Sequence, residues 1–402
     1  MAPTPTAARR AETAAVTDML CRLVAFDTTS HLSNLALIDF VADHLAGHEV
    51  GATRIENDDA TKASLLAVIG PRVAGGIVLS GHTDVVPVAG QDWISDPFTL
   101  TEAEGRLHGR GAADMKGFLA TALALVPEFL DADLKVPIIL AFSYDEEVGC
   151  LGADALIRRL VADVPAPHAA VVGEPSSMAV AAAHRGIDNF VTTVKGRPGH
   201  ASATHKGVSA VAYAAECVAF LNRLETELRA VTASDDFDPP FTTINAGRIA
   251  GGSATNVIAP ECRIDWECRT VPGVTADVVA GRLNAFVTEQ LLPRMQDIAP
   301  EADVTTTAVV SVPGFSAPPD SRATALALSL TGQNHPTTVP FGSEAGMFEN
   351  AGIPTVICGP GSPDQAHRAN EYVTAADLEA CAAFMRGLAR WAAARDTSAD
   401  RD

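Results

Sequence analysis

The chain has 402 residues, of which 47% are hydrophobic, so it is long enough for two domains with separate cores. Its formal net charge of −20 disfavours binding to nucleic acids or to anionic membranes, because both require a basic face. The seven cysteines lie mostly in apolar segments without a CxxC pair, and no secretory leader or membrane-spanning apolar run is found. We therefore expect a cytoplasmic protein with reduced cysteines that contacts neither nucleic acid nor membrane.

The first 183 residues alternate helical apolar spacing with short apolar runs that are typical of buried strands. The predicted helices cover 12–23, 37–45, 115–130 and 154–161. The predicted strands cover 63–69, 76–80, 136–143 and 169–173. The same style returns after residue 300, with helices at 322–331 and 375–394 around a strand at 354–358. This alternation predicts an α/β domain, in which a mostly parallel sheet is flanked by helices.

Between these two parts the pattern changes to that of a half-exposed sheet. Strands are predicted at 188–194, 242–249 and 263–269, and long helices at 208–228 and 274–292. We expect this block to form an antiparallel sheet with two helices, that is, an inserted α+β domain. The predicted boundaries are residues 1–183 and 300–402 for a discontinuous catalytic domain, and residues 184–299 for the insert.

His82 and Asp84 follow directly after the apolar run at 76–80. Residues two apart in an extended segment point to the same side, so Asp84 could orient the imidazole of His82. A carboxylate that holds a histidine in this way is typical of metal sites.

Further candidate ligands share this setting, because each lies in a strand-ending loop or at a helix start. They are Asp114, Glu147, Glu174 and His367. Taken alone, Asp114 could be an ordinary helix cap, and the acidic turn 145–147 an ordinary solvated turn. Taken together, these positions converge at the carboxyl ends of parallel strands. Two imidazoles and three carboxylates suit two divalent ions such as zinc, with one carboxylate bridging them.

These motifs resemble those of the co-catalytic zinc amidohydrolases, a family that also includes desuccinylases, aminoacylases and carboxypeptidases. The resemblance covers nearly the whole chain. It implies that His82 and Glu174 hold one ion, that Glu147 and His367 hold the other, and that Asp114 bridges them. Zinc is the expected metal, with cobalt as the alternative.

The resemblance also assigns roles beside the metal ligands. Asp84 would orient His82, Glu146 would be the general base, and the peptide bond between Asp114 and Met115 would be cis. The insert matches the family's lid or dimerisation domain, so a homodimer through this domain is implied. His200, in the motif GRPGHAS, would then reach a neighbouring active site and polarise the scissile carbonyl. The alternative for His200 is a histidine in a surface loop.

Three residues are candidate substrate contacts, each with a plain structural alternative. Asn256 lies in the motif GGSATN, and Arg269 ends a strand whose polar face could simply be solvated. Glu344 could recognise an amine, although a carboxylate at a helix N-terminus is equally well explained by the helix dipole.

The stretch that begins FGSEAG, together with GEPSSM and AHRG, most resembles the branch of the family that deacetylates N2-acetylornithine. We therefore expect hydrolysis of N2-acetyl-L-ornithine to L-ornithine and acetate, a step of arginine biosynthesis. The alternatives are the same chemistry on acetylcitrulline, on succinyl-diaminopimelate or on a C-terminal peptide bond. An alternative of a different class is a non-catalytic scaffold that binds a metal or an amino acid.

Overall fold

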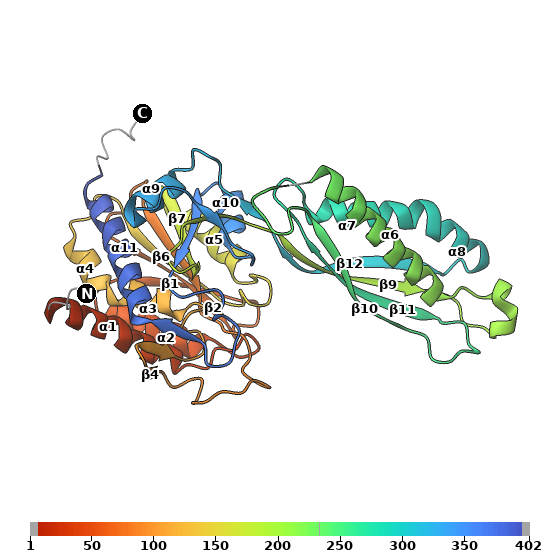
Figure 1. The fold of residues 1–402 in the computed structure, drawn as a ribbon, viewed down its shortest axis with the longest axis horizontal. Helices are drawn as coiled ribbons and strands as arrows, with labels where there is room; N and C mark the ends of the chain where they lie inside the picture. The colour runs from red at the N-terminus through yellow and green to blue at the C-terminus, as the bar shows by residue number, and fades with distance from the viewer. Residues whose placement is uncertain (1–6, 233, 396–402) are drawn as a thin grey trace. The chain divides into compact units, whose positions relative to one another are not determined.

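A computed structural model describes residues 7–232 and 234–395 (Figure 1). The chain forms two compact units. The first comprises Met1–Ala183, Ala317–Val339 and Ser343–Asp402, and the second His184–Ser316 and Pro340–Gly342. Each unit has its own cluster of buried hydrophobic side chains. Within the described part of the chain, no helix is long and apolar enough to cross a bilayer.

The large sheet has nine strands in the order β1-β2-β6-β3-β7-β15-β8-β13, with β14 beside β8. Its strands are β1 Ala52–Glu56, β2 Ala63–Ile69, β3 Ile77–His82, β6 Ile138–Ser143, β7 Ala169–Pro175, β8 Ala181–His184, β13 Phe315–Ser316, β14 Thr337–Thr338 and β15 Thr355–Gly359. The central strands β6, β3, β7 and β15 run parallel and are buried at every position. Such apolar runs are required where helices cover both faces of a sheet. The predicted α/β class with a mostly parallel sheet is therefore confirmed.

Helices of the first unit pack around this sheet (Figure 1). They are α1 Ala7–Val24, α2 Leu35–Ala46, α3 Lys116–Ala124, α4 Val126–Asp131, α5 Ala153–Asp163, α9 Arg322–Thr331, α10 Ala345–Asn350 and α11 Ala375–Ala393. Helix α3 packs on β3 and β7, and α1 and α11 pack on α3. The single helix predicted at 115–130 is two helices, because Pro127 in the first turn of α4 favours a new start there. A small sheet contains β4 Thr101–Ala103, β5 Arg106–His108 and β16 Tyr372–Thr374.

The second unit is a four-stranded antiparallel sheet in the order β10-β11-β9-β12, with helices packed on one face (Figure 1). The strands are β9 Ile187–Lys195, β10 Thr243–Gly251, β11 Glu261–Arg269 and β12 Asp303–Val312. The helical segments are η1 Ala201–Lys206, α6 Ala210–Val231, α7 Ala276–Phe286, the π-turn η2 Val287–Leu291, and α8 Leu292–Ile298. The predicted helix 274–292 is thus broken by a π-turn and continues to residue 298. The inserted α+β architecture is confirmed.

Strand β12 lies beyond the end predicted for the insert, which was residue 299. It pairs with β9 along its length, for example through Thr306 and Thr192, and so completes the sheet of the second unit. Strand β12 lies at the edge of the sheet and several of its residues are exposed. Its sequence therefore lacks the apolar pattern by which the buried strands were predicted. The compact second unit accordingly extends to Ser316.

Candidate metal centre

The candidate ligands of the first unit come from the carboxyl ends of neighbouring strands. His82 is the last residue of β3, Glu147 follows β6, and Glu174 is near the end of β7. Strand β3 is parallel to both neighbours, and His82 is in register with Ser143, the last residue of β6. Parallel strands end at one edge of a sheet, so these side chains are delivered to the same place.

Asp114 precedes α3 and lies between two imidazoles. Its Oδ1 is 3.1 Å from Nε2 of His82, and its Oδ2 is 3.3 Å from Nε2 of His367. Nε2 of His367 also lies 2.9 Å from Oε2 of Glu147. The peptide bond between Asp114 and Met115 is cis, as the family resemblance implies. One carboxylate thus faces both halves of the cluster.

Two overlapping groups have the geometry of metal ligands. The atoms of each group lie within 4.8 Å of one another, and the groups are His82, Asp114 and Glu147, and His82, Glu146 and Glu174. Oε1 of Glu174 is buried without a hydrogen-bond partner, 3.8 Å from Nε2 of His82. Imidazole nitrogens and carboxylate oxygens are the donors that zinc prefers, and an orphaned buried carboxylate oxygen fits a bound cation. The residues present therefore fit a divalent metal centre.

The charges of the cluster also favour a cation. Burial raises the pKa of Glu146 and Glu174 well above the ordinary glutamate value, and that of Glu147 to about 7. Hydrogen bonds to Asp114 and Glu147 raise the pKa of His367 to about 10. Burial opposes charge on Asp114, yet hydrogen bonds from His367 and His82 hold its pKa below the ordinary value. Crowded carboxylates need positive charge to ionise together, and a metal ion supplies it.

Asp84 supports this cluster in a different way from the predicted one. The Nδ1 of His82 lies 2.9 Å from the main-chain carbonyl oxygen of Asp84, and 3.6 Å from its carboxylate. The carboxylate accepts hydrogen bonds from the backbone N–H groups of Glu146 (3.0 Å) and Glu147 (3.3 Å), and from the Ser30 hydroxyl (2.7 Å). Asp84 therefore orients His82 through its backbone and holds the acidic turn through its side chain.

Glu344 lies just before α10 and is almost completely buried. One carboxylate oxygen accepts a hydrogen bond from the Ser80 hydroxyl at 3.2 Å, and the Ser143 hydroxyl at the end of β6 also interacts with this carboxylate. The side chain does not cap α10. Ser80 lies on β3 two residues before His82, so Glu344 is attached to the strand that delivers a metal ligand.

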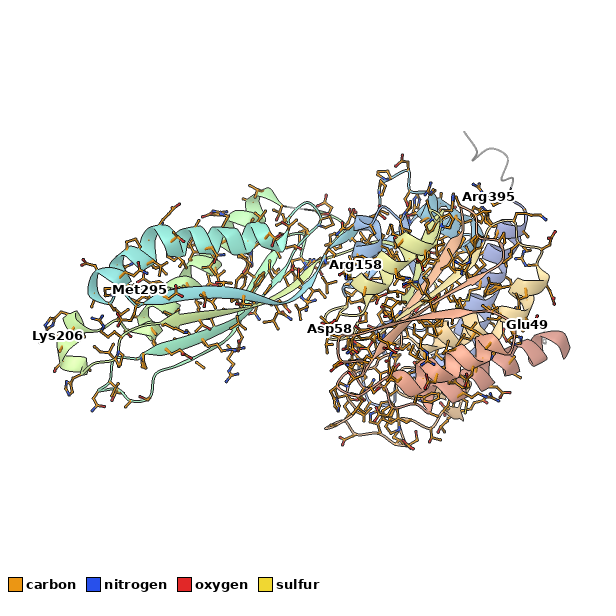
Figure 2. All side chains as sticks on the ribbon, turned by 180° about the vertical axis from the view of Figure 1, so that it is seen from behind. Glu49, Asp58, Arg158, Lys206, Met295 and Arg395 are labelled. Atoms are coloured by element: carbon orange, nitrogen blue, oxygen red, sulfur yellow. The ribbon has the colours of Figure 1, made fainter. Side chains whose placement is uncertain are left out.

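In the second unit, the other candidates lie at opposite ends of the sheet. His200 is exposed beside η1, and the backbone N–H of Ala201 donates to the carbonyl of Asn256 at 3.0 Å. Lys206, the last residue of η1, marks this end in Figure 2. Arg269 ends β11 near the residue at which β9 begins, and it pairs with Glu267 at 2.8 Å. His200 and Asn256 thus form one group, and Arg269 belongs to another.

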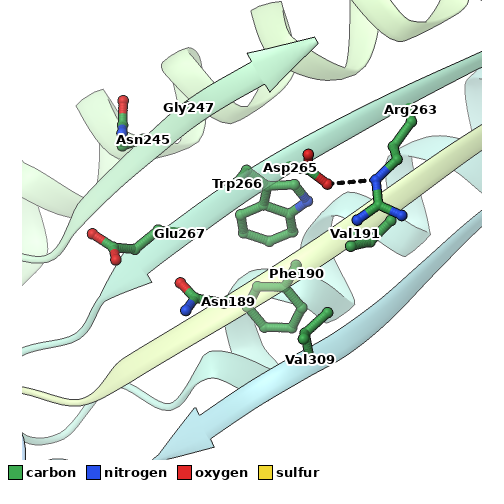
Figure 3. Close-up of a pocket in the computed structure, with 10 residues that line it drawn as sticks. All are labelled: Asn189, Phe190, Val191, Asn245, Gly247, Arg263, Asp265, Trp266, Glu267 and Val309. Atoms are coloured by element: carbon green, nitrogen blue, oxygen red, sulfur yellow. Dashed lines mark hydrogen bonds and ion pairs between the residues drawn. The ribbon is translucent and has the colours of Figure 1, made fainter. Parts of the chain in front are cut away.

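A hollow of about 360 Å³ lies on the open face of this sheet (Figure 3). It coincides with bulges in β10 and β12, where the register shifts around Gly247 and Val309. A bulge bends its strand, so two bulges at one level hollow the sheet. Arg263 and Asp265 in this hollow form an ion pair of 2.7 Å. The hollow contains none of the candidate metal ligands.

Lys62, Arg110 and Glu371 support the first unit and were not predicted from the sequence, and Asp145 was considered there only as part of a solvated turn. Lys62 binds Asp145 at 2.5 Å, and Arg110 binds Glu371 at 2.7 Å. Their partners are 83 and 261 residues away along the chain, so no local pattern reveals them. Glu371 lies four residues after the candidate ligand His367, and this proximity was the signal that the sequence offered.

The α/β fold with its carboxylate-rich centre is that of a metal-dependent hydrolase. The profile of peptidase family M20/M25/M40 matches residues 78–391, and the chain belongs to this family. An acetylornithine deacetylase from Myxococcus xanthus is 36% identical over 94% of this chain and 97% of its own. A protein of the same name from Proteus mirabilis is 34% identical, over 88% of this chain and 89% of its own.

Solved structures share the fold at low sequence identity. The aminopeptidase PepT from Bacillus cereus superposes with a TM-score of 0.72 at 19% identity, over 95% of this chain and 99% of its own. A dinuclear metal-binding peptidase of the M20 family from Bacillus subtilis superposes with a TM-score of 0.64 at 16% identity, over 95% of this chain and 98% of its own. These structures show the fold alone. The family match, the deacetylase relatives and the candidate ligand groups confirm the predicted class of enzyme, a metal-dependent hydrolase.

Proposed function

We propose that the chain hydrolyses the amide bond of N2-acetyl-L-ornithine, giving L-ornithine and acetate. The observation that carries this proposal is the 34–36% identity, over most of the chain, to relatives named acetylornithine deacetylase. The cluster of imidazoles and carboxylates supports the hydrolytic chemistry.

The contacts of each side chain support the proposed ligand roles. His82 and Glu174 hold one ion, His367 and Glu147 hold the other, and Asp114 faces both. Zinc is the proposed metal, and cobalt is the alternative. When bound, the ions supply Lewis acidity at the reacting carbonyl.

Glu146 is the proposed general base. It lies in the same cluster as His82 and Glu174, and its backbone is held by Asp84. Its raised pKa suits a group that first accepts and then donates a proton. Glu146 takes a proton from the attacking water, the water oxygen bonds to the carbonyl carbon, and the C–N bond breaks. The proton then passes to the leaving nitrogen.

The insert contributes the remaining groups. His200 donates a hydrogen bond to the developing oxyanion, while Asn256 and Arg269 bind polar groups of the substrate. Loss of one oxyanion donor typically lowers kcat about 100- to 1000-fold. His200→Ala is therefore expected to lower kcat by that factor. A variant within a few-fold of wild type would remove this role from His200.

The length of the strands in the insert supports the proposal of homodimerisation through this domain. Residues 188 and 195 of β9 pair with 268 and 261 of β11, and seven residues of strand span roughly 23 Å. His200 lies beyond one end of this stretch and Arg269 at the other. A single small substrate cannot reach both from one chain. We propose that His200 and Asn256 act on the substrate of a partner subunit, and that Arg269 does not share that substrate with the His200 of its own chain.

A panel of substrates tests the choice of acetylornithine. The values of kcat/KM are compared for acetylornithine, acetylcitrulline and succinyl-diaminopimelate, with the zinc- and cobalt-loaded protein. We expect acetylornithine to give the highest value. A clear preference for either of the other two would overturn the proposed substrate and leave the hydrolytic class intact.

Glu344 is proposed to favour the cationic side chain of ornithine, because it is a buried carboxylate held by the hydroxyl groups of Ser80 on β3 and Ser143 on β6. Glu344→Gln should raise KM for acetylornithine and leave KM for a neutral acetylamino acid such as acetylmethionine unchanged. An equal effect on both substrates would assign Glu344 to the packing of α10 on the sheet instead.

A further inference from the structure

A buried ion pair between Arg110 and Glu371 contacts the backbone of the candidate ligand Asp114 but is not itself among the candidate ligands. Arg110 donates to Oε2 of Glu371 at 2.7 Å, and both side chains are only 1% exposed. Burying two charges costs free energy unless their remaining hydrogen-bonding positions are also filled. Nε of Arg110 is buried without a partner, but the other positions are filled, and the groups that fill them are informative.

The carboxylate of Glu371 accepts hydrogen bonds from the main chain of the loop that carries Asp114. The backbone N–H of Gly111 donates to Oε2 at 3.1 Å. Those of Ala113 (2.9 Å) and Asp114 (3.0 Å) donate to Oε1. The loop is thus wrapped around this carboxylate, and its last contact is the backbone of Asp114 itself.

The guanidinium of Arg110 reaches the other metal-binding loop. It donates to the carbonyl of Arg368 at 3.3 Å and to Oε1 of Gln91 at 2.5 Å. The amide nitrogen of Gln91 in turn donates to the carbonyl of His367 at 2.9 Å. Arg110 also lies over the ring of Trp93, 5.1 Å from its centre. One ion pair therefore fixes the backbones of Asp114 and His367 together.

His367 depends on these backbone contacts more than the other ligands do. Its side chain is 56% exposed, whereas that of Asp114 is 10% exposed. Little packing therefore holds the imidazole in place. Its backbone adopts a φ of 64°, which a residue other than glycine takes only when its surroundings impose it.

We propose that Arg110, Glu371 and Gln91 form a positioning unit, which sets the geometry of Asp114 and His367 and thereby the affinity for the ion that His367 binds. The inference rests on the metal centre proposed above. Residues that orient metal ligands typically change metal affinity about 10- to 100-fold when replaced.

Metal titration of the apoprotein tests this proposal. Metal-free protein is titrated with Zn²⁺ in competition with a chromophoric chelator, and with Co²⁺ while the visible absorption of the bound ion is recorded. Wild type should bind two ions. Gln91→Ala should weaken one of them by about 10-fold or more and leave the other within a few-fold of wild type. Glu371→Gln should weaken the same ion by at least that factor, and it can also weaken the second ion because Glu371 holds the backbone of Asp114.

Gln91→Ala is the decisive variant, because Gln91 is only partly buried and its loss should leave the apoprotein folded. Its circular dichroism and melting temperature in the metal-free form should match those of wild type. The matched control is Glu128→Gln, which breaks an exposed Arg–Glu pair, between Arg386 and Glu128, in the same unit. Glu128→Gln should bind both ions as wild type does.

Each contrary outcome has a distinct meaning. If folded Gln91→Ala and Glu371→Gln bind both ions with wild-type affinity, the positioning role is wrong. If Glu371→Gln does not fold, the metal affinities of Gln91→Ala alone decide whether the positioning role is correct. If wild type binds fewer than two ions, the proposed metal centre itself is overturned, independently of the positioning unit.

Discussion

Glu146 and Glu147 are adjacent in the chain but belong to different groups of candidate ligands, which share His82. Glu147 lies with His82 and Asp114, and Glu146 with His82 and Glu174. The two backbone N–H groups of this turn donate to one carboxylate, that of Asp84. Because the backbone is held at both residues, the side chains of Glu146 and Glu147 can point in different directions, as their different proposed roles require.

The role of Glu146 is tested by its removal. Glu146→Ala should lower kcat by about 100- to 10,000-fold, since a positioned general base contributes about that factor. The metal content should be unchanged, because the proposed ligands remain. Metal analysis and steady-state kinetics on the same preparation measure both quantities. A variant with near-normal kcat would show that another group takes the proton, and Glu102→Ala, on the exposed strand β4, serves as the control.

At the scale of elements, the buried strands were the most predictable part of the molecule. The apolar runs at 76–80, 136–143 and 169–173 correspond to β3, β6 and β7, whose shared edge carries the cluster. Their side chains are buried on both faces, so composition alone identifies them.

Other elements could not be predicted, for physical reasons. Only two of the ten residues of strand β12 are buried, so they lack the apolar pattern of a core strand. The ion pair of Arg110 with Glu371 joins residues 261 positions apart, and only the folded sheet brings them together. The contact of the Asp84 carboxylate with the turn after β6 likewise depends on tertiary structure.

Strands β9 and β12 also hold a carboxylate whose ionisation opposes folding. Ser311 donates to Asp188 at 2.6 Å, and burial raises the pKa of Asp188 from 3.8 to about 6. The folded state thus binds this proton more tightly than the unfolded state, so its contribution to stability is complete below pH 3.8. It is lost as the pH rises to about 6.

Asp188→Asn should remove this pH dependence. At pH 7.5 its free energy of unfolding should exceed that of wild type by roughly 1 kcal/mol, reduced from the full shift by solvent screening. At pH 4 the difference should largely disappear. Urea denaturation at both pH values measures it, with Asp303→Asn on β12 as the control. A variant that is less stable than wild type at pH 7.5 would contradict the expected sign.

At the scale of the whole molecule, the two units have separate cores, and the candidate metal ligands all belong to the first. Binding of a ligand stabilises only the structure that forms its site. Metal binding should therefore raise the stability of the first unit more than that of the second.

Zinc is expected to raise the melting temperature of the first unit. The stabilisation is about 2.7 kcal/mol for one site when free metal is 100 times the dissociation constant. Trp93 and Trp391 report on the first unit and Trp266 on the second, so fluorescence of Trp→Phe variants separates the transitions. His367→Ala should reduce the shift. An equal shift of both units in zinc would argue against a site confined to the first.

The opposite positions of His200 and Arg269 along the inserted sheet have a genetic consequence. If His200 serves a partner's site, Glu146→Ala and His200→Ala are defects that complement each other within one gene. A mixed dimer has one doubly damaged site and one intact site, so random mixing of the two inactive proteins should restore about a quarter of wild-type activity. If His200 serves its own chain, the mixture stays inactive. In a cell, each allele alone should abolish growth that depends on acetylornithine. The two alleles together should restore this growth only if each active site contains residues of both subunits.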